Sequence, residues 1–191
     1  MTLPAGIPQN QAEVAAFLEQ LAGAAPIQTH ISAIFVGRDT AWKMKKAVAL
    51  GFLDFSTLAA RAHFCRRELE LNQPAAPAIY RDVVAITRAP DGRLQEGGVG
   101  EALEWVLRMA PIPAGDFLDA VAARGGLTPA LLDALGDAVF TLHQSAHRVD
   151  VPDPSSAMEA VLSGNLRAAR AAGLPEAILA PLAARFQKAL E

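Results

Sequence analysis

The sequence has a single cysteine, Cys65, among its 191 residues. One cysteine excludes an internal disulfide framework and a cysteine-rich zinc site, and it favours a reducing compartment. The chain also lacks any uncharged apolar run near the roughly 18 residues that a membrane helix requires. Its first residues, MTLPAGIPQNQAEV, contain no basic region followed by an apolar core. We therefore expect a cytoplasmic protein that does not bind a membrane.

An excess of basic charge is missing as well. The 17 lysines and arginines are outnumbered by 20 acidic residues, which gives a net charge of −3. A nucleic-acid-binding protein usually has a basic footprint, so we expect no nucleic-acid partner. Hydrophobic residues make up 52% of the chain and charged residues 19%, a composition typical of a globular protein. The positive charge is nevertheless uneven, because Lys43, Lys45 and Lys46 are close neighbours.

Strand patterns occur only before residue 110, and the later residues are rich in alanine and leucine. The predicted strands are residues 30–36, 40–48, 83–88 and 101–109. A helix ending near Gly23 precedes them, and a longer helix that ends near Asn72 lies between the second and the third. The sequence therefore predicts an α+β protein, with a small, mostly antiparallel sheet in residues 1–110 and an all-helical part in residues 111–191.

Two predictions concern where the helices begin. Asn10 and Glu13 have the spacing of a capping box for the first helix. Asp54 or Ser56 can cap the long helix, whose apolar stripe includes Cys65. We therefore expect Cys65 to be a small buried hydrophobic residue.

Two lysines in the second predicted strand lie on one face of it. Trp42 and Met44 alternate with Lys43 and Lys45, so one face of the strand is apolar and the other has two ammonium groups. The long helix that follows has two candidate partners, Glu68 and Glu70, on opposite sides of its apolar stripe and about equally far from its centre. Periodicity does not choose between them. These charges could also be solvated surface groups, which is the usual role of lysine and glutamate.

The order of these elements is the one that a kinase-type nucleotide site requires. Such a site has a strand, a turn, a strand with a phosphate-binding lysine, a helix with a glutamate that pairs with the lysine, two more strands, and then helices. An extended segment after the last strand then presents backbone groups to the base.

Six segments in this order carry a resemblance to a known family: Thr29–Ser32, Phe35–Val48, Gly51–Arg61, Glu68–Asn72, Ile79–Arg88 and Glu104–Met109. They resemble the aminoglycoside phosphotransferase-like domain, a kinase-like N-terminal domain of bacterial two-part proteins in which a P-loop ATP-binding domain follows. The resemblance covers the chain from residue 25 onward. It implies a protein-kinase-like N-lobe followed by an incomplete helical lobe.

The resemblance also implies a function and a site. The parent activity would be transfer of a phosphoryl group from ATP or GTP, with Mg²⁺, to a small hydroxylated acceptor. Lys43 would hold the phosphates, with Lys45 as the alternative, and Glu68 would orient the lysine. The remaining residues implied to bind nucleotide lie in a phosphate-covering loop (Thr29, His30 and Ser32) and in a hinge that holds the base (Trp105, Val106, Leu107, Arg108 and Met109).

The catalytic loop of that family has no counterpart in this sequence. Such a loop supplies a catalytic aspartate and nearby metal ligands, from a His-Gly-Asp-Leu-His-type motif that is absent here. The run His147-Arg148-Val149-Asp150 does not replace it, because its aspartate is out of register and the next asparagine is Asn165. No P-loop motif is present either. We expect a chain truncated before the catalytic loop, inactive alone, without catalytic residues or metal ligands, whose partners are the missing lobe and the P-loop domain. The alternative is a pseudo-kinase lobe that acts as a binding or regulatory module.

Overall fold

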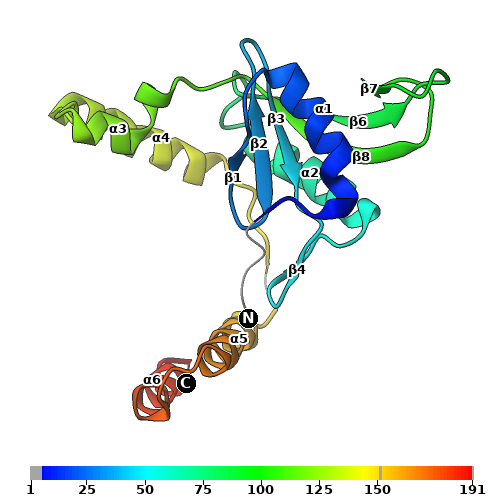
Figure 1. Ribbon diagram of the computed structural model, residues 1–191. Coiled ribbons are helices and arrows are strands. Elements are labelled where there is room, and N and C mark those ends of the chain that lie inside the picture. The colour runs from blue at the N-terminus through cyan, green and yellow to red at the C-terminus, as the bar shows by residue number, and fades with distance from the viewer. Residues whose placement is uncertain (1–5, 151, 191) are drawn as a thin grey trace. The chain divides into compact units, whose positions relative to one another are not determined.

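The computed structural model describes residues 6–150 and 152–190 and confirms an α+β protein with an antiparallel sheet (Figure 1). Its helices are α1 (Ala12–Ala22), α2 (Leu58–Asn72), α3 (Leu118–Ala123), α4 (Pro129–Ser145), α5 (Pro154–Ala171) and α6 (Glu176–Leu190), with short 3-10 turns at Gln9–Gln11 and Ala114–Asp116. Its strands are β1 (Ile27–Gln28), β2 (Ser32–Val36), β3 (Ala41–Lys45), β4 (Ala49–Leu50), β5 (Leu53–Asp54), β6 (Tyr80–Arg88), β7 (Leu94–Glu96) and β8 (Ala102–Met109).

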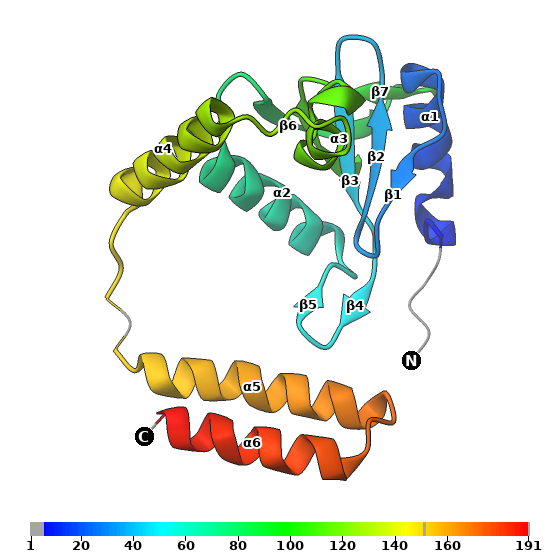
Figure 2. The ribbon, with the colours of Figure 1, turned by 90° about the vertical axis from the view of Figure 1, so that its left-hand side faces the viewer.

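The chain forms two compact units. The first, which we call the sheet unit, contains residues 6–49 and 54–146, and the second, the helical unit, contains residues 50–53, 147–150 and 152–190. The division follows residue 146, whereas composition led us to expect it after residue 110. Both α3 and α4 therefore belong to the sheet unit although they follow its last strand. In the helical unit, α5 and α6 lie side by side (Figure 2).

The main sheet has six strands in the order β1-β2-β3-β8-β6-β7, and each neighbouring pair is antiparallel. Strand β3 lies between β2 and β8, opposite Ser32 to Val36 on one side and Val106 to Met109 on the other. The chain segment that joins β3 to β6 contains β4, β5 and α2. Strand β3 is interior to the sheet, which fixes the direction of its side chains.

The sheet unit has a helix on each side of the sheet (Figure 2). Helix α1 packs Val14, Ala15 and Leu18 onto an apolar face made by Ala33, Phe35, Trp42, Met44, Ile86 and Val106. Helix α2 lies on the other side, against β8 and β6, with Ala62 and Cys65 buried. Alternate strand residues point to opposite faces, so Lys43 and Lys45 are directed toward α2 while Trp42 and Met44 face α1.

The caps predicted for α1 and α2 were both wrong. Gln11, not Asn10, precedes α1, and its side chain makes no cap because it bonds groups in the core. Glu13 instead binds Arg88. At α2 the cap is Thr57, whose Oγ1 accepts a hydrogen bond from the Ala60 N–H at 3.1 Å, while Asp54 accepts one from Ser56.

The strands are close to the predicted ranges, with differences at their ends. The first predicted strand begins only at Ser32, because Thr29 and Ser32 close a turn. The second ends at Lys45, and the third begins earlier, at Tyr80. Strands β1, β4, β5 and β7 are two or three residues long and were not predicted. Within the described ranges, no helix combines the length and the apolar character that a bilayer span requires.

Candidate functional site: a lysine–glutamate cluster between strand β3 and helix α2

The site is a three-residue ion cluster that joins β3 to α2. Lys43 Nζ lies 2.6 Å from Glu68 Oε1, and Lys45 Nζ lies 2.7 Å from Glu68 Oε2. The two lysines are two positions apart on one strand face, so each can reach a different oxygen of one carboxylate. Lys45 also lies 5.0 Å from the centre of the Phe55 ring, at cation–π distance.

The two lysines differ in their contact with solvent. The Lys43 side chain is 26% exposed and the Lys45 side chain only 7%, with Glu68 at 17%. Lys45 is therefore the buried lysine of the cluster, close to both the Glu68 carboxylate and the Phe55 ring, while Lys43 is the lysine nearer to solvent. A solute reaching the cluster would meet Lys43 first.

The two lysines keep the carboxyl group of Glu68 ionised. Burial by itself would raise the pKa of this carboxyl group, but the hydrogen bonds and charges of Lys43 and Lys45 outweigh burial and hold the pKa below its ordinary value of 4.5. Glu68 is therefore ionised at neutral pH. The cluster has two positive charges and one negative, so a net positive charge remains for an anion.

The structure also distinguishes the two candidate glutamates. Glu70, which periodicity ranked equally with Glu68, forms a surface pair with Arg67 at 2.9 Å on the same helix. Its side chain is 68% exposed. Glu68 is the one that points to the sheet.

The turn that was predicted to cover a phosphate joins β1 to β2 and ends beside Lys45. Thr29 closes it, because its Oγ1 accepts from the Ser32 N–H at 3.0 Å and its N–H donates to the Ser32 carbonyl. Thr29 and His30 are exposed. Ser32 is opposite Lys45 in the strand register, so the two side chains share a face. The Ser32 side chain is buried, and its Oγ has no hydrogen-bond partner among the described residues.

The residues that were predicted to form a hinge lie in a strand that is paired on both sides. These residues, Trp105 to Met109, lie within β8, which pairs with β3 on one side and β6 on the other. Val106 and Leu107 are fully buried. Their backbone groups are already used in the sheet, so a base could meet free backbone groups only after Met109.

Two side chains of this segment have partners elsewhere in the sheet unit. Arg108 makes two hydrogen bonds to Asp82, at 2.7 and 2.6 Å, and lies 3.6 Å from Glu96. The Trp105 ring is covered by the Arg66 guanidinium, whose carbon lies 4.4 Å from the ring centre. Neither residue contacts the lysine–glutamate cluster through an interaction that the structure records.

A buried polar network beside the site was not predicted. Glu104, on β8, accepts hydrogen bonds from Arg61 Nε at 2.9 Å and from Gln11 Nε2 at 2.7 Å. All three residues are at most 5% exposed. A glutamate in the apolar strand EALEWVLRM is a signal that could have indicated a buried partner, because ionised side chains are rarely buried unpaired.

Two further residues near the cluster are buried. Lys46 follows β3 and is 1% exposed, and burial lowers its pKa. Cys65 is fully buried on α2, as predicted from its position in the apolar stripe, and burial raises the pKa of its thiol to about 11. Cys65 therefore lacks the thiolate character that a nucleophilic cysteine needs.

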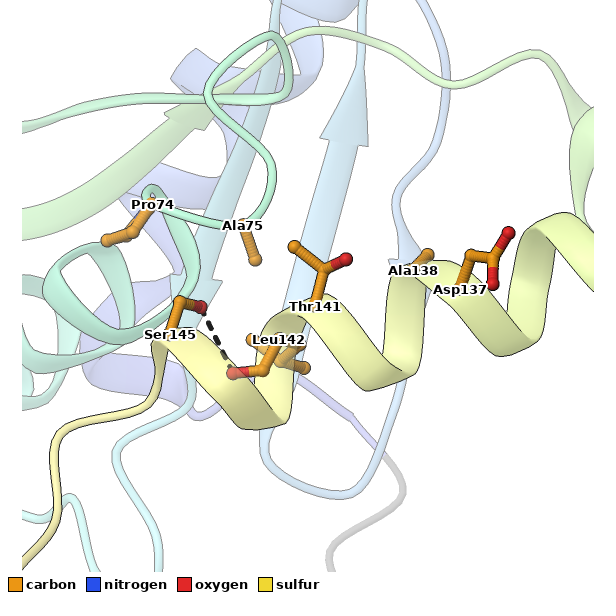
Figure 3. A pocket seen from close by; sticks show the side chains of 7 residues that line it. All are labelled: Pro74, Ala75, Asp137, Ala138, Thr141, Leu142 and Ser145. Carbon is orange, nitrogen blue, oxygen red and sulfur yellow. Dashed lines mark hydrogen bonds between the residues drawn. The ribbon is translucent and has the colours of Figure 1, made fainter.

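Surface hollows occur elsewhere in the sheet unit. One, of about 350 Å³, lies between the segment after α2 and the end of α4 (Figure 3). Its lining includes no lysine or arginine, and Ser145 Oγ donates to the Leu142 carbonyl at 3.1 Å instead of facing a solute. The other, of about 540 Å³, lies beside the end of α1. Neither hollow is lined by Lys43, Lys45 or Glu68. We therefore assign the candidate site to these three charged residues and not to a hollow.

Comparisons with known proteins give relatives but no family. No family model matches the sequence, and no solved structure matches it. The chain is 27% identical over 121 residues to the uncharacterized protein Rv2004c of Mycobacterium tuberculosis and to the uncharacterized protein Mb2027c of Mycobacterium bovis. The matched part is 63% of this chain and 22% of each relative. The match therefore spans about a fifth of the length of each of these relatives.

Proposed function

We propose that this chain is the nucleotide-binding front part of a kinase-like small-molecule phosphotransferase, with a protein-kinase-like N-lobe as the fold of its sheet unit. The observation that carries the proposal is the contact of one helix carboxylate, Glu68, with two strand lysines at 2.6 and 2.7 Å. A lysine aimed by a glutamate on the neighbouring helix is the arrangement with which kinases hold the phosphates of ATP.

The order of the elements supports the same proposal. Strands β2 and β3 are joined by a turn, β3 carries the lysines, α2 carries the glutamate, and β6 and β8 follow before the helices. Strand β8 is the neighbour of β3 in the sheet. The chain would therefore leave the sheet next to the lysine strand, where a bound nucleotide would place its base.

Exposure assigns the lysines different roles in this proposal. Lys43, at the outer edge of the cluster, would contact the phosphates, and Lys45 would hold Glu68 in place from below. The Ser32 hydroxyl is buried and has no hydrogen-bond partner among the described residues. It lies on the same sheet face as Lys45 and would supply a further hydrogen bond to the phosphates. The turn of Thr29 and His30 would cover the phosphates from solvent.

The base would meet the segment that follows β8. Within residues 110–113, Pro111 and Pro113 have no N–H, and the Ala110 N–H donates to the Ile79 carbonyl. The Ile112 N–H is the donor that this segment has left. We therefore place the hinge contact at Ile112 instead of at Trp105 to Met109.

The described part of the chain offers no cluster of metal ligands. Among residues 6–150 and 152–190, no three histidine, cysteine, aspartate or glutamate side chains gather closely enough to hold one. The ligands of Mg²⁺, the binding site of the phosphoryl acceptor and the catalytic aspartate would therefore belong to other parts of a longer protein. The isolated chain would bind nucleotide weakly and transfer no phosphate.

Calorimetric titration of the chain with Mg-ATP and with Mg-GTP tests the proposal. We expect weak binding, and binding at least about tenfold weaker in Lys43→Ala, because an ammonium–phosphate hydrogen bond is charge-assisted. Lys188→Ala, in α6 of the other unit, is the matched control and should bind as the wild type does. Equal affinities for Lys43→Ala and the wild type would contradict the proposal.

A second candidate function, a non-catalytic binding module, is favoured by the surface of the helical unit. Large apolar side chains are exposed on both of its helices, namely Met158, Val161, Ile178 and Leu182. Exposed apolar side chains that gather on one surface are typical of an interaction site. A docking module would tolerate Lys43→Ala, so the same titration, together with a partner-binding assay, separates the two functions.

A further inference from the structure

Helix α2 is attached to the sheet by two ion pairs of opposite polarity. Arg61 and Glu68 are seven residues apart, which is about two turns and about 10 Å along a helix, so they lie on nearly the same side of it. Arg61 binds Glu104 on β8, and Glu68 binds Lys43 and Lys45 on β3. The helix thus has a positive group near its start and a negative group further along, and the sheet has the complementary order.

We propose that Arg61 and Glu104 form a positioning pair that sets the register of α2, so that Glu68 meets both lysines. The link to nucleotide binding rests on the proposed function, whereas the link to the lysine–glutamate cluster does not. A helix that slid by two turns would bring Glu68 against Glu104, two like charges. A slide of one turn would leave both carboxylates without their cations.

Glu104 is held by more groups than a surface ion pair would have. Both of its oxygens lie 2.9 Å from Arg61 Nε, and it also accepts from Gln11 Nε2 at 2.7 Å and from the Trp105 N–H at 2.9 Å. Arg61 in turn donates through Nη1 to the carbonyls of Phe55 and Ser56, at 2.9 and 3.0 Å. The pair therefore has directional bonds that define one position for the start of α2.

Gln11 joins this pair to the end of the lysine strand. Its Nε2 donates to the Lys45 carbonyl at 2.8 Å, and its Oε1 accepts from the Ala47 N–H at 2.7 Å. Gln11 precedes α1, on the side of the sheet opposite α2. One amide thus bonds both the carboxylate that holds α2 and the backbone that bears Lys45.

A buried ion pair is a weak source of stability, and this makes a positioning role testable. Replacing such a pair by apolar residues of similar size often leaves stability unchanged or raises it, because the desolvation of both charges is avoided. If Arg61 and Glu104 only stabilised the fold, an apolar pair should replace them without effect on the lysines. If they position α2, stability and lysine protection should separate.

The experiment compares two double variants in the whole chain. R61M/E104M removes the buried pair, and R67M/E70M removes the exposed pair on the same helix, whose side chains are 48% and 68% exposed. Urea unfolding reports stability. Acylation by an amine-reactive ester, without nucleotide, reports how well Glu68 covers Lys43 and Lys45, with Lys188 as internal reference and tandem mass spectrometry to separate the sites.

We expect R61M/E104M to keep a cooperative urea transition while Lys43 and Lys45 acylate on the order of tenfold faster, as loss of a charge-assisted hydrogen bond implies. R67M/E70M should change neither rate. Wild-type acylation rates in R61M/E104M would overturn the proposal. So would the loss of its cooperative transition, because the pair would then be required for folding itself.

A nucleotide titration of the same variants separates this proposal from the proposed function. Weaker Mg-ATP binding by R61M/E104M, with R67M/E70M unchanged, would extend the positioning role to the nucleotide. If the wild type binds no nucleotide, the proposed function fails, and the acylation rates still decide whether Arg61 and Glu104 position Glu68.

Discussion

Replacing Glu68 by glutamine should destabilise the sheet unit by about 2 to 3 kcal/mol. Removing one partner of a fully buried ion pair costs about 3 to 5 kcal/mol, because the other charge is left uncompensated. Here Lys45 is nearly buried at 7% exposure, while Lys43, at 26%, can turn toward water. The glutamine oxygen can still accept from one of them. Both effects reduce the expected loss below that of a fully buried pair.

Glu70→Gln is the control, because it removes the same charge two residues further along α2. Its partner Arg67 is 48% exposed, so the change should be within about 0.5 kcal/mol. Urea unfolding followed by tryptophan fluorescence measures both variants, since Trp42 and Trp105 both lie in the sheet unit. Equal midpoints for Glu68→Gln and Glu70→Gln would refute the assignment of Glu68 to the cluster.

Three further predictions use other properties of the chain. The folded-state pKa of Glu68 lies below its ordinary value of 4.5. The stability that the ionised carboxylate contributes is therefore complete above about pH 4.5 and is lost as the pH falls through the folded-state pKa. From about pH 5 to about pH 3, urea midpoints should fall less in Glu68→Gln than in the wild type. Cys65, with its pKa raised to about 11, should not react with a disulfide reagent at neutral pH until urea unfolds the chain, and fast labelling of the native protein would contradict its burial. Gly23→Ala should cost about 1 kcal/mol because Gly23 has a left-handed φ of 70°, whereas Gly136→Ala on the exposed face of α4 should stabilise by about 0.5 to 1 kcal/mol; thermal unfolding compares the two.

The fold class and the lysine strand could be predicted because both depend on local periodicity. Trp42, Lys43, Met44 and Lys45 alternate with the period of a strand, and the structure places the lysines on one face and the apolar pair on the other. The lengths of the long helices and strands follow from the same kind of pattern. Short elements such as β7 do not, because three residues of strand have no period to recognise.

Whether the backbone of Trp105 to Met109 is free to bind a base could not be judged from local pattern. Residues 101–109 predict a strand, and the structure confirms one at Ala102–Met109. Whether its backbone is free for a base depends on how many neighbours the strand has. Those neighbours are β3 and β6, which come from residues far from it in the sequence. A strand with both edges paired has no backbone groups left for a ligand.

The cap predicted for the first helix was wrong for a related reason. Asn10 and Glu13 have the spacing of a capping box, but Gln11 is drawn into the core, where it bonds Glu104 and the backbone on either side of Lys46. A local cap contributes about 1 kcal/mol, whereas leaving a buried carboxylate and two backbone groups unpaired would cost more. Tertiary bonds therefore determine how the first helix begins.

The segment RRELE, Arg66 to Glu70, shows most directly where sequence periodicity ends. Its two glutamates are equally placed about the apolar stripe, and only one of them meets a lysine. The difference arises from β3, whose Lys43 lies 25 positions before Glu68 in the sequence. It also arises from Arg61 and Glu104, which set the register of α2 against the sheet. The apolar stripe alone leaves the rotation of α2 about its own axis uncertain by the angle between Glu68 and Glu70. Two ion pairs on nearly the same side, two turns apart, remove that uncertainty, so the identity of the site residue is a property of the pair of anchors and not of the helix alone.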